Sequence, residues 1–546
     1  MRHLSIFFII LLNTICLSAQ KNIPPEKPKL IIAIVVDMMR YDYVERYWNK
    51  FGKGGFRRLI NEGANCRNAN YNYIFTQTGP GHATIFTGTE PANHGIVTNY
   101  WYLRLKKTGQ YCVADNNVKT VGSDSEAGQC SPVQLNTSTI GDEIKLANNS
   151  RSKVIGIAIK DRAAILPAGH TADAAYWYDG KTGNWITSTY YLDSLPLWVT
   201  DFNEKKYPDI YLAREWNTLL PIEEYTESLP DSSIYEKGFA NRQITFPYNL
   251  DEISSTSRNS RDYSILKYTP YGNTYTNDFA IAAIVNEELG KDEITDMLTV
   301  SYSVPDYIGH AYGPASVETE DIYLRLDREI EHLLTFVDET LGKKEVLIVL
   351  TSDHGVAHIP EYLADIGIPA GKFKHNLALA LLKSYLNAIY GEGEWVSTYS
   401  QQQIYLNHQL IEDSKIPLAE IQTKVANFLI QFSGIENTAT STTMQTVNFT
   451  DGIFDKMQNS YNQKRSGDVI INLSPGFTED ITSATTHNTA YNYDTHVPLI
   501  WYGWKINRSS IYKSISTTDI APTISLLLNI PFPNGATGKP IVEIIE

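Results

Sequence analysis

Short apolar runs recur along the chain, at 30–36, 153–159, 297–303, 346–351 and 497–502. Each run is rich in Ile, Val or Leu and alternates little between apolar and polar positions. Strands covered on both faces of a sheet have this pattern, so we predict buried parallel strands. Helical patterns lie between them, for example at 139–148, 277–289 and 321–341. This alternation predicts an α/β fold with a mainly parallel central sheet flanked by helices.

Two stretches interrupt the alternation of strands and helices. Residues from about 165 to 275 are rich in Tyr, Trp, Asn and Pro, and those from about 370 to 480 include a polar Ser/Thr/Asn tract. The chain has no internal repeat and no linker long enough to separate independent domains. We therefore interpret both stretches as insertions that cap the sheet edge of a single catalytic domain spanning 20–546.

The first nineteen residues have the pattern of a secretory signal peptide. Arg2 and His3 precede a mostly apolar run over 4–12, and Ala19 offers a small residue at a plausible cleavage point. The run is too short to span a bilayer comfortably. We expect an exported protein, periplasmic or secreted, that has no stable membrane insertion.

Composition narrows the class of protein further. Hydrophobic residues make up 42% of the chain and charged residues 20%, which favours a sizeable core over disorder. The net charge of -15 argues against a non-specific nucleic-acid binder, which needs a basic face. Cys66, Cys112 and Cys130 follow the signal, so an oxidising compartment would allow one disulfide and leave one thiol over.

Charged side chains follow the predicted strands where each run ends. Asp37, Lys160, Asp306 and Asp353 follow four different runs. Ligands of open α/β sheets bind beyond the carboxyl ends of the strands, so these side chains should meet at one edge. A buried carboxylate such as Asp37 costs several kcal/mol, on the order of 5, unless it is paired or metal-bound.

Imidazoles accompany these carboxylates. Asp306 and His310 are four residues apart, a spacing that one helical turn places on one face. His354 adjoins Asp353, while His487 and His496 precede the last predicted strand. Oxygen and nitrogen ligands without thiolates suit a hydrolytic zinc site.

Several motifs in a fixed order give this sequence a family resemblance. They are VVDMMR around Asp37, TQTGPGHATIFTG around Thr78, HGIVTNYWY around Asn99, KDRAAILPAGH around Lys160, DYIGHAYGP, TSDHG, and YDTHVPLIWYG followed by DIAPT. With them the chain resembles the alkaline phosphatase superfamily, and most closely the phosphate-irrepressible alkaline phosphatases with a threonine nucleophile. The resemblance runs over nearly the whole mature chain and implies an alkaline-phosphatase-like catalytic domain.

The resemblance implies a site with two Zn²⁺ ions. One ion would be held by Asp306, His310 and His487, and the other by Asp37, Asp353 and His354 with Thr78 as fourth ligand. Members of the family usually have Gly after the last histidine, whereas Asn488 follows His487 here. His496 is the competing ligand, although its place directly before a strand favours a structural role.

Thr78 is the expected nucleophile, because the family match selects it over Thr76. A zinc-bound threonine hydroxyl has a lowered pKa and needs no general base, so we interpret His82 as a supporting or packing residue. A helix start nearby would favour an anionic oxygen. Without the metal ligands, the same Thr78 would be an ordinary helix N-cap.

Lys160, Arg162 and Asn99 form the expected phosphate pocket. We expect an extended segment, in which residues 160 and 162 share a face and reach one phosphate together. Two cations suit the two negative charges of a phosphate monoester, which favours a phosphomonoesterase. The resemblance implies that it acts through a phosphothreonine intermediate. We expect a monomer that acts on small-molecule phosphate monoesters.

Three other functions compete with this interpretation. A phosphodiesterase or nucleotide pyrophosphatase of the same superfamily would keep the zinc ligands. A sulfatase would carry a Cys/Ser-x-Pro-x-Arg motif, which CSPVQ at Cys130 matches except that Gln134 replaces the Arg. A non-catalytic protein with a decayed phosphatase fold would lack ligands that this sequence has.

Overall fold

The computed structural model describes residues 26–239, 243–257 and 260–545. Its largest sheet has 11 strands, in the order β22-β2-β21-β14-β1-β13-β6-β7-β8-β5 with β23 beside β2. β22 (Ser509–Ile511) and β23 (Ile515–Ser516) are short strands at one end of this sheet. The middle of the sheet is parallel and runs through four predicted strands. They are β14 (Val346–Thr351), β1 (Leu30–Val36), β13 (Asp296–Tyr302) and β6 (Val154–Ala158).

The fifth predicted strand is present but runs the other way. β21 (His496–Gly503) pairs antiparallel with β14 and with β2 (Ala64–Asn70), so the prediction of a parallel strand there was wrong. Six of its eight residues are buried. A strand covered on both faces is apolar throughout whichever way it runs, so its sequence does not reveal its direction.

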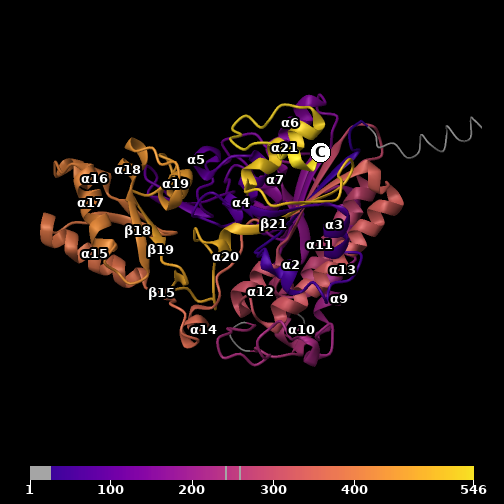
Figure 1. Ribbon diagram of the computed structural model, residues 1–546, viewed down its shortest axis with the longest axis horizontal. Coiled ribbons are helices and arrows are strands. Elements are labelled where there is room, and N and C mark those ends of the chain that lie inside the picture. Colours follow the sequence, from indigo (N-terminus) through magenta and orange to yellow (C-terminus); the bar gives the residue numbers. More distant parts are fainter. Residues whose placement is uncertain (1–25, 240–242, 258–259, 546) are drawn as a thin grey trace, which may run out of the picture.

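Helices cover both faces of the sheet and build a core on each (Figure 1). Alternate residues of β1 point to opposite sides: Ile32 and Ile34 belong to one core, Ile31 and Val35 to the other. The first core includes α11 (Pro270–Asn286) and α13 (Val317–Thr340). The second includes α6 (Ile140–Ala147) and α21 (Ile520–Leu528).

The aromatic stretch at about 165–275 extends the sheet and fills its core. β7 (Ala174–Asp179) continues the parallel pairing beyond β6, and β8 (Asn184–Ser188) follows it antiparallel. Trp185 is fully buried and stacks on Phe279 of α11, with ring centroids 4.5 Å apart. Many of its aromatic side chains therefore pack in the core.

The stretch at about 370–480 forms a smaller sheet with strands β16 (Val396–Ser400), β17 (Gln403–Leu406), β19 (Val469–Leu473) and β18 (Ile435–Thr440). Two long helices, α15 (His375–Tyr390) and α17 (Leu418–Leu429), share a hydrophobic core with this sheet. Figure 1 shows these orange elements to one side of the central sheet. We call residues 371–479 the insertion.

The predicted signal peptide at 1–19 lies outside the described residues. Within the part of the chain that the structure describes, no helix is both long and apolar enough to cross a membrane. Cys66, Cys112 and Cys130 are all buried, and each is a free thiol.

Candidate active site

Neighbouring parallel strands deliver the predicted side chains to one edge of the central sheet. Asp37 directly follows β1, and Asp353 lies just beyond β14. Lys160 is the N-cap residue of α7 (Asp161–Ala168), which follows β6. Asp306 lies in the first turn of α12 (Val304–Tyr312), which follows β13. Because these strands are adjacent and parallel, their carboxyl ends place the four groups side by side.

The first candidate ligand group consists of Asp306, His310 and His487, whose ligand atoms all lie within 4.8 Å of one another. His310 follows Asp306 by one turn of α12, and its Nε2 lies 3.4 Å from Asp306 Oδ1. His487 comes from the segment before β21, and its Nε2 lies 3.7 Å from the same oxygen. The structure therefore brings these three predicted ligands together.

The second candidate group consists of Asp37, Asp353 and His354, which are fully buried and meet the same 4.8 Å limit. His354 Nε2 lies 3.5 Å from Asp37 Oδ1 and 3.5 Å from Asp353 Oδ2. It is also 4.0 Å from Asp306 Oδ1, and its ring stacks on His487 with centroids 3.7 Å apart. The two groups are therefore immediate neighbours.

Hydrogen bonds at the far side of each imidazole bear on whether these residues fit a metal. The Nδ1 atoms of His310, His354 and His487 lie 2.9, 2.9 and 2.6 Å from the backbone carbonyls of Thr485, Gly355 and Thr76. A carbonyl only accepts, so each Nδ1 carries the proton and each Nε2 is an unprotonated acceptor in the neutral ring.

These Nε2 acceptors face carboxylate oxygens, which also only accept. Asp37 Oδ1, Asp306 Oδ1, Asp353 Oδ2 and His354 Nε2 are buried and have no hydrogen-bond partner in the described structure. Two ligands about 2.0–2.1 Å from one tetrahedral zinc lie roughly 3.3 Å apart, close to the separations seen here. The donor set and its spacing fit two zinc ions.

Neighbouring charges shift the pKa values of the buried carboxylates in opposite directions. Burial and the neighbouring Asp353 raise the pKa of Asp37 well above its usual range. Burial alone would also raise the pKa of Asp306. The charges of Lys160 and His310 outweigh burial there and lower the pKa of that carboxyl. The Lys160 ammonium contacts both, at 2.6 Å from Asp37 Oδ2 and 2.5 Å from Asp306 Oδ2. Burial lowers the pKa of Lys160, but Asp306 and Asp37 outweigh it and raise the pKa overall.

Thr78 is the first residue of α4 (Thr78–Thr87), and its N-cap is Gln77. Thr78 is therefore not the N-cap that its sequence also allowed. The helix lies close against the end of β14, because a Cβ added at Gly81 would lie 2.2 Å from the carbonyl oxygen of Asp353. This close approach sets the start of the helix, and with it Thr78, beside the second ligand group.

Lys160 and Arg162 both reach the Thr78 hydroxyl. Lys160 Nζ lies 3.3 Å from Thr78 Oγ1, and Arg162 Nη2 lies 3.4 Å from it. The segment is not extended as expected, because Arg162 already belongs to the first turn of α7. The two cations converge because a helix start turns their side chains toward α4.

Asn99 completes the surroundings of Thr78. Its Oδ1 accepts a hydrogen bond of 2.8 Å from the Gly79 N–H, in the first turn of α4. Because a backbone N–H only donates, the oxygen of this amide must face the helix. The Nδ2 donor of Asn99 is thus left for another acceptor.

The remaining predicted residues lie outside the two groups. His82 is buried and contacts the Thr78 carbonyl, Ser301 Oγ and Asp353. His496 lies 3.0 Å from the Arg67 carbonyl and stacks on Tyr41.

Cys130, the residue that suggested a sulfatase, lies 3.6 Å from Asp161 Oδ2.

Sequence reasoning missed two residues that contact the predicted cations. Tyr111 accepts a hydrogen bond of 3.0 Å from Arg162 Nη1, and the Tyr307 ring centroid lies 5.2 Å from Lys160 Nζ. Tyr307 directly follows Asp306 inside a recognised motif and could have been noticed there. Tyr111 lies on β4 (Thr108–Tyr111), outside the motifs that carry the family resemblance.

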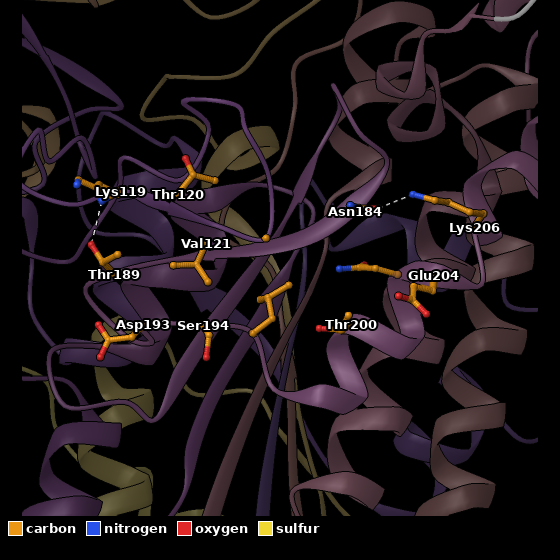
Figure 2. A pocket seen from close by; sticks show the side chains of 13 residues that line it. Lys119, Thr120, Val121, Asn184, Thr189, Asp193, Ser194, Thr200, Glu204 and Lys206 are labelled. Carbon is orange, nitrogen blue, oxygen red and sulfur yellow. Dashed lines mark hydrogen bonds between the residues drawn. The ribbon is translucent and has the colours of Figure 1, made fainter.

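A wide cavity of about 620 Å³ lies away from these residues (Figure 2). It runs along the edge of the central sheet, beside β5 (Thr120–Val121) and β8. Lys119, Asp193 and Lys206 are among its lining residues, whereas none of the six candidate metal ligands lines it. The cavity is therefore separate from the candidate active site.

Comparisons with known proteins show the family of this chain. The family model for type I phosphodiesterase / nucleotide pyrophosphatase matches residues 31–496. Alkaline phosphatase PhoV of Synechococcus elongatus is 40% identical over 95% of this chain and 93% of its own. A protein of Myroides odoratus named calcium-transporting ATPase is 41% identical over 95% of both chains.

The likeness extends to solved structures. The crystal structure of alkaline phosphatase PafA superposes with a TM-score of 0.91 at 39% identity, covering 95% of this chain and 99% of that one. PafA of Elizabethkingia meningoseptica is 39% identical in sequence over 97% of this chain. A PafA variant with a threonine, an asparagine, a lysine and an arginine substituted gives a TM-score of 0.90. The chain belongs to the type I phosphodiesterase / nucleotide pyrophosphatase family, and its resemblance to the alkaline phosphatases is confirmed.

Proposed function

We propose that the chain is an exported, zinc-dependent alkaline phosphatase that hydrolyses phosphate monoesters through a phosphothreonine intermediate. One observation carries this proposal: Lys160 and Arg162 converge on the Thr78 hydroxyl beside two groups of metal ligands. The names of the relatives at about 40% identity support the same activity. The signal-peptide pattern of residues 1–19 supports export.

Six side chains would hold the two zinc ions, with Thr78 as a further ligand. They are Asp306, His310 and His487 for one ion and Asp37, Asp353 and His354 for the other. Bound zinc would supply Lewis acidity and lower the pKa of the oxygens it binds. The backbone carbonyls at the three Nδ1 atoms keep each Nε2 free for this purpose.

Each of the residues around Thr78 would have a separate role in phosphoryl transfer. Thr78 would lose its hydroxyl proton to solvent, and Oγ1 would attack phosphorus, forming the Thr–phosphate bond. The P–O bond to the leaving group would break, and the departing oxygen would take a proton from solvent. Water would then attack the same phosphorus, the P–Oγ1 bond would break, and a proton of that water would return to Thr78 as inorganic phosphate leaves. Lys160 and Arg162 would neutralise the non-bridging oxygens, and the free Nδ2 of Asn99 would donate to one of them.

The chain order of these residues also supports their roles. Thr78, Asn99, Lys160 and Arg162 follow one another in the order threonine, asparagine, lysine and arginine. The PafA variant carries substitutions of the same four residue types in the same order.

A phosphodiesterase is the second candidate, because the matching family model is described by that activity. The two activities differ in the charge on the non-bridging oxygens. A monoester carries up to two negative charges there and a diester carries one. Two cations beside Thr78 favour the monoester.

The test combines metal content, substrate preference and the Thr78→Ala variant. We expect about two zinc ions per chain, a larger kcat/KM for 4-nitrophenyl phosphate than for its bis ester, and loss of turnover in Thr78→Ala. Full activity of that variant would exclude the threonine mechanism. A larger kcat/KM for the diester would instead support the second candidate.

A further inference from the structure

The insertion reaches the candidate active site through the tight turn between β16 and β17. Gln401 and Gln402 form this turn, and both have positive φ angles, of 51° and 59°. Two-residue hairpin turns with two positive φ angles usually contain Asn-Gly or similar pairs, because side chains with a Cβ are strained there. Strained backbone persists where the surroundings require it, often at functional sites.

Gln401 contacts the residue that precedes the nucleophile. Gln77 is 3% exposed, and its Oε1 accepts a hydrogen bond of 2.7 Å from the Asn99 N–H. Because that backbone group only donates, it fixes the orientation of the Gln77 amide. The Nε2 of Gln77 therefore points the other way and donates to Gln401 Oε1 at 2.5 Å.

The chain of hydrogen bonds continues to the start of α4. Asn99, held through its N–H by Gln77, accepts from the Gly79 N–H through Oδ1. Gln401, Gln77, Asn99 and Gly79 are thus linked in series. This series fixes the direction of Asn99 Nδ2, the donor assigned to the phosphate.

Gln402 makes a second contact on the other side of the turn. Its side chain is 2% exposed, and its Nε2 donates to the Asn488 carbonyl at 3.0 Å. Asn488 follows the candidate ligand His487, whose Nδ1 bonds to the carbonyl of Thr76. One turn therefore holds both the segment before Thr78 and the segment after His487.

We propose that the β16–β17 turn positions the catalytic residues, with Gln77 and Gln401 as positioning residues for phosphoryl transfer. This proposal rests on the proposed function of Thr78 and Asn99. The turn keeps its strained conformation because each of its two side chains has a fixed partner outside the insertion. Gln401 bonds to Gln77, and Gln402 bonds to the Asn488 carbonyl. The insertion thereby sets the geometry of a site on another sheet.

Two variants separate positioning from folding. Gln401→Ala removes the hydrogen bond to Gln77, and Gln401→Gly also relieves the strain at φ 51°. We expect kcat for 4-nitrophenyl phosphate to fall about tenfold in both, because small misplacements of catalytic groups are costly. The Tm of Gln401→Gly should equal or exceed that of the wild type.

A double-mutant cycle with Asn99→Ala tests the route of the effect. If Gln401 acts through Gln77 and Asn99, Gln401→Ala should change kcat less than twofold, roughly, once Asn99 is already Ala. The matched control is Gln409→Ala, which should leave kcat unchanged. Gln409 is an exposed glutamine of the insertion, and its side chain donates to Asp413 Oδ1.

Several outcomes would overturn the proposal. Unchanged kcat in Gln401→Ala, a loss of kcat that tracks a loss of Tm, or additive effects with Asn99→Ala would each do so. Failure of the proposed function is distinguishable, because Thr78→Ala would then keep its activity or the wild type would lack it.

Discussion

At the scale of single residues, Thr78 takes its chemistry from its neighbours. Its side chain is buried at the first position of α4, where threonine alone would be unremarkable. Two cations within 3.3 and 3.4 Å of its oxygen make the position suited to an anion. The same cations explain why a monoester, with its additional negative charge, should be preferred.

The substitution of both cations tests this preference. We expect Lys160→Ala with Arg162→Ala to lower kcat/KM for a phosphate monoester by about 100-fold or more, since charge-assisted donors are lost from the transition state. The loss for a matched diester should be much smaller. Steady-state kinetics with both substrates measure the difference, and equal losses would remove the role assigned to the pair.

At the scale of elements, the packing of α4 against β14 depends on a residue without a side chain. A Cβ at Gly81 would lie 2.2 Å from the Asp353 carbonyl oxygen, so either the helix or the strand end must move. We expect Gly81→Ala to cost about 1–3 kcal/mol of stability and to displace Thr78. Thermal unfolding measures the loss of stability, and kcat measures the effect of displacing Thr78.

Gly109 provides the matched control for this change. It lies in the exposed part of β4, and a Cβ added there meets nothing within 4 Å. Gly109→Ala should therefore leave both Tm and kcat close to the wild type. A Gly81→Ala protein as stable and active as this control would show that α4 does not need the close approach.

The same elements show how far the sequence alone could lead. The runs that form β1 and β14 were predicted with their observed bounds, because fully buried strands are continuously apolar. β2 was missed, since its sequence ANCRNAN is polar despite four buried positions. The predicted direction of β21 was wrong for a related reason: the burial of a strand determines its composition, and its direction does not.

Without the family motifs, the candidate site was predictable only where its residues follow strands. Asp37, Lys160, Asp306 and Asp353 each lie within three residues of the end of an apolar run, which places them at one edge. Gln77 and Gln401 lie 324 positions apart, and no local pattern indicates that they meet. Contacts between a catalytic sheet and an insertion depend on how the two pack, which a sequence pattern does not specify.

At the scale of the whole molecule, a net charge of -15 coexists with two cations beside Thr78. Buried acids also lie away from the site. Glu318, in the first turn of α13, is fully buried and accepts a hydrogen bond of 2.6 Å from Tyr248. Burial raises the pKa of Glu318, and burial together with Glu318 raises the pKa of Glu236. Both carboxyls therefore hold their protons more tightly in the folded state.

This difference predicts how the stability of the fold changes with pH. Above the ordinary pKa of a glutamate, about 4.3, the unfolded chain releases protons that the folded chain still holds. The free energy of unfolding should therefore fall as pH rises through neutrality toward the raised pKa values. Glu236→Gln removes one of the two carboxyls that hold a proton only in the folded state. The free energy of unfolding of this variant should therefore fall by about 1 kcal/mol or more less than that of the wild type between pH 6 and pH 9.

Urea unfolding at the two pH values measures this slope, and a surface variant separates it from general charge repulsion. Glu412→Gln removes the same formal charge from an exposed position, so it relieves only the repulsion within an acidic molecule. Because that repulsion is spread over the surface and screened by salt, its removal should change the slope little. Equal slopes in Glu236→Gln and Glu412→Gln would mean that the buried pair does not control alkaline stability. A flatter slope in Glu236→Gln alone would locate that control at the contact between α13 and the segment containing Glu236.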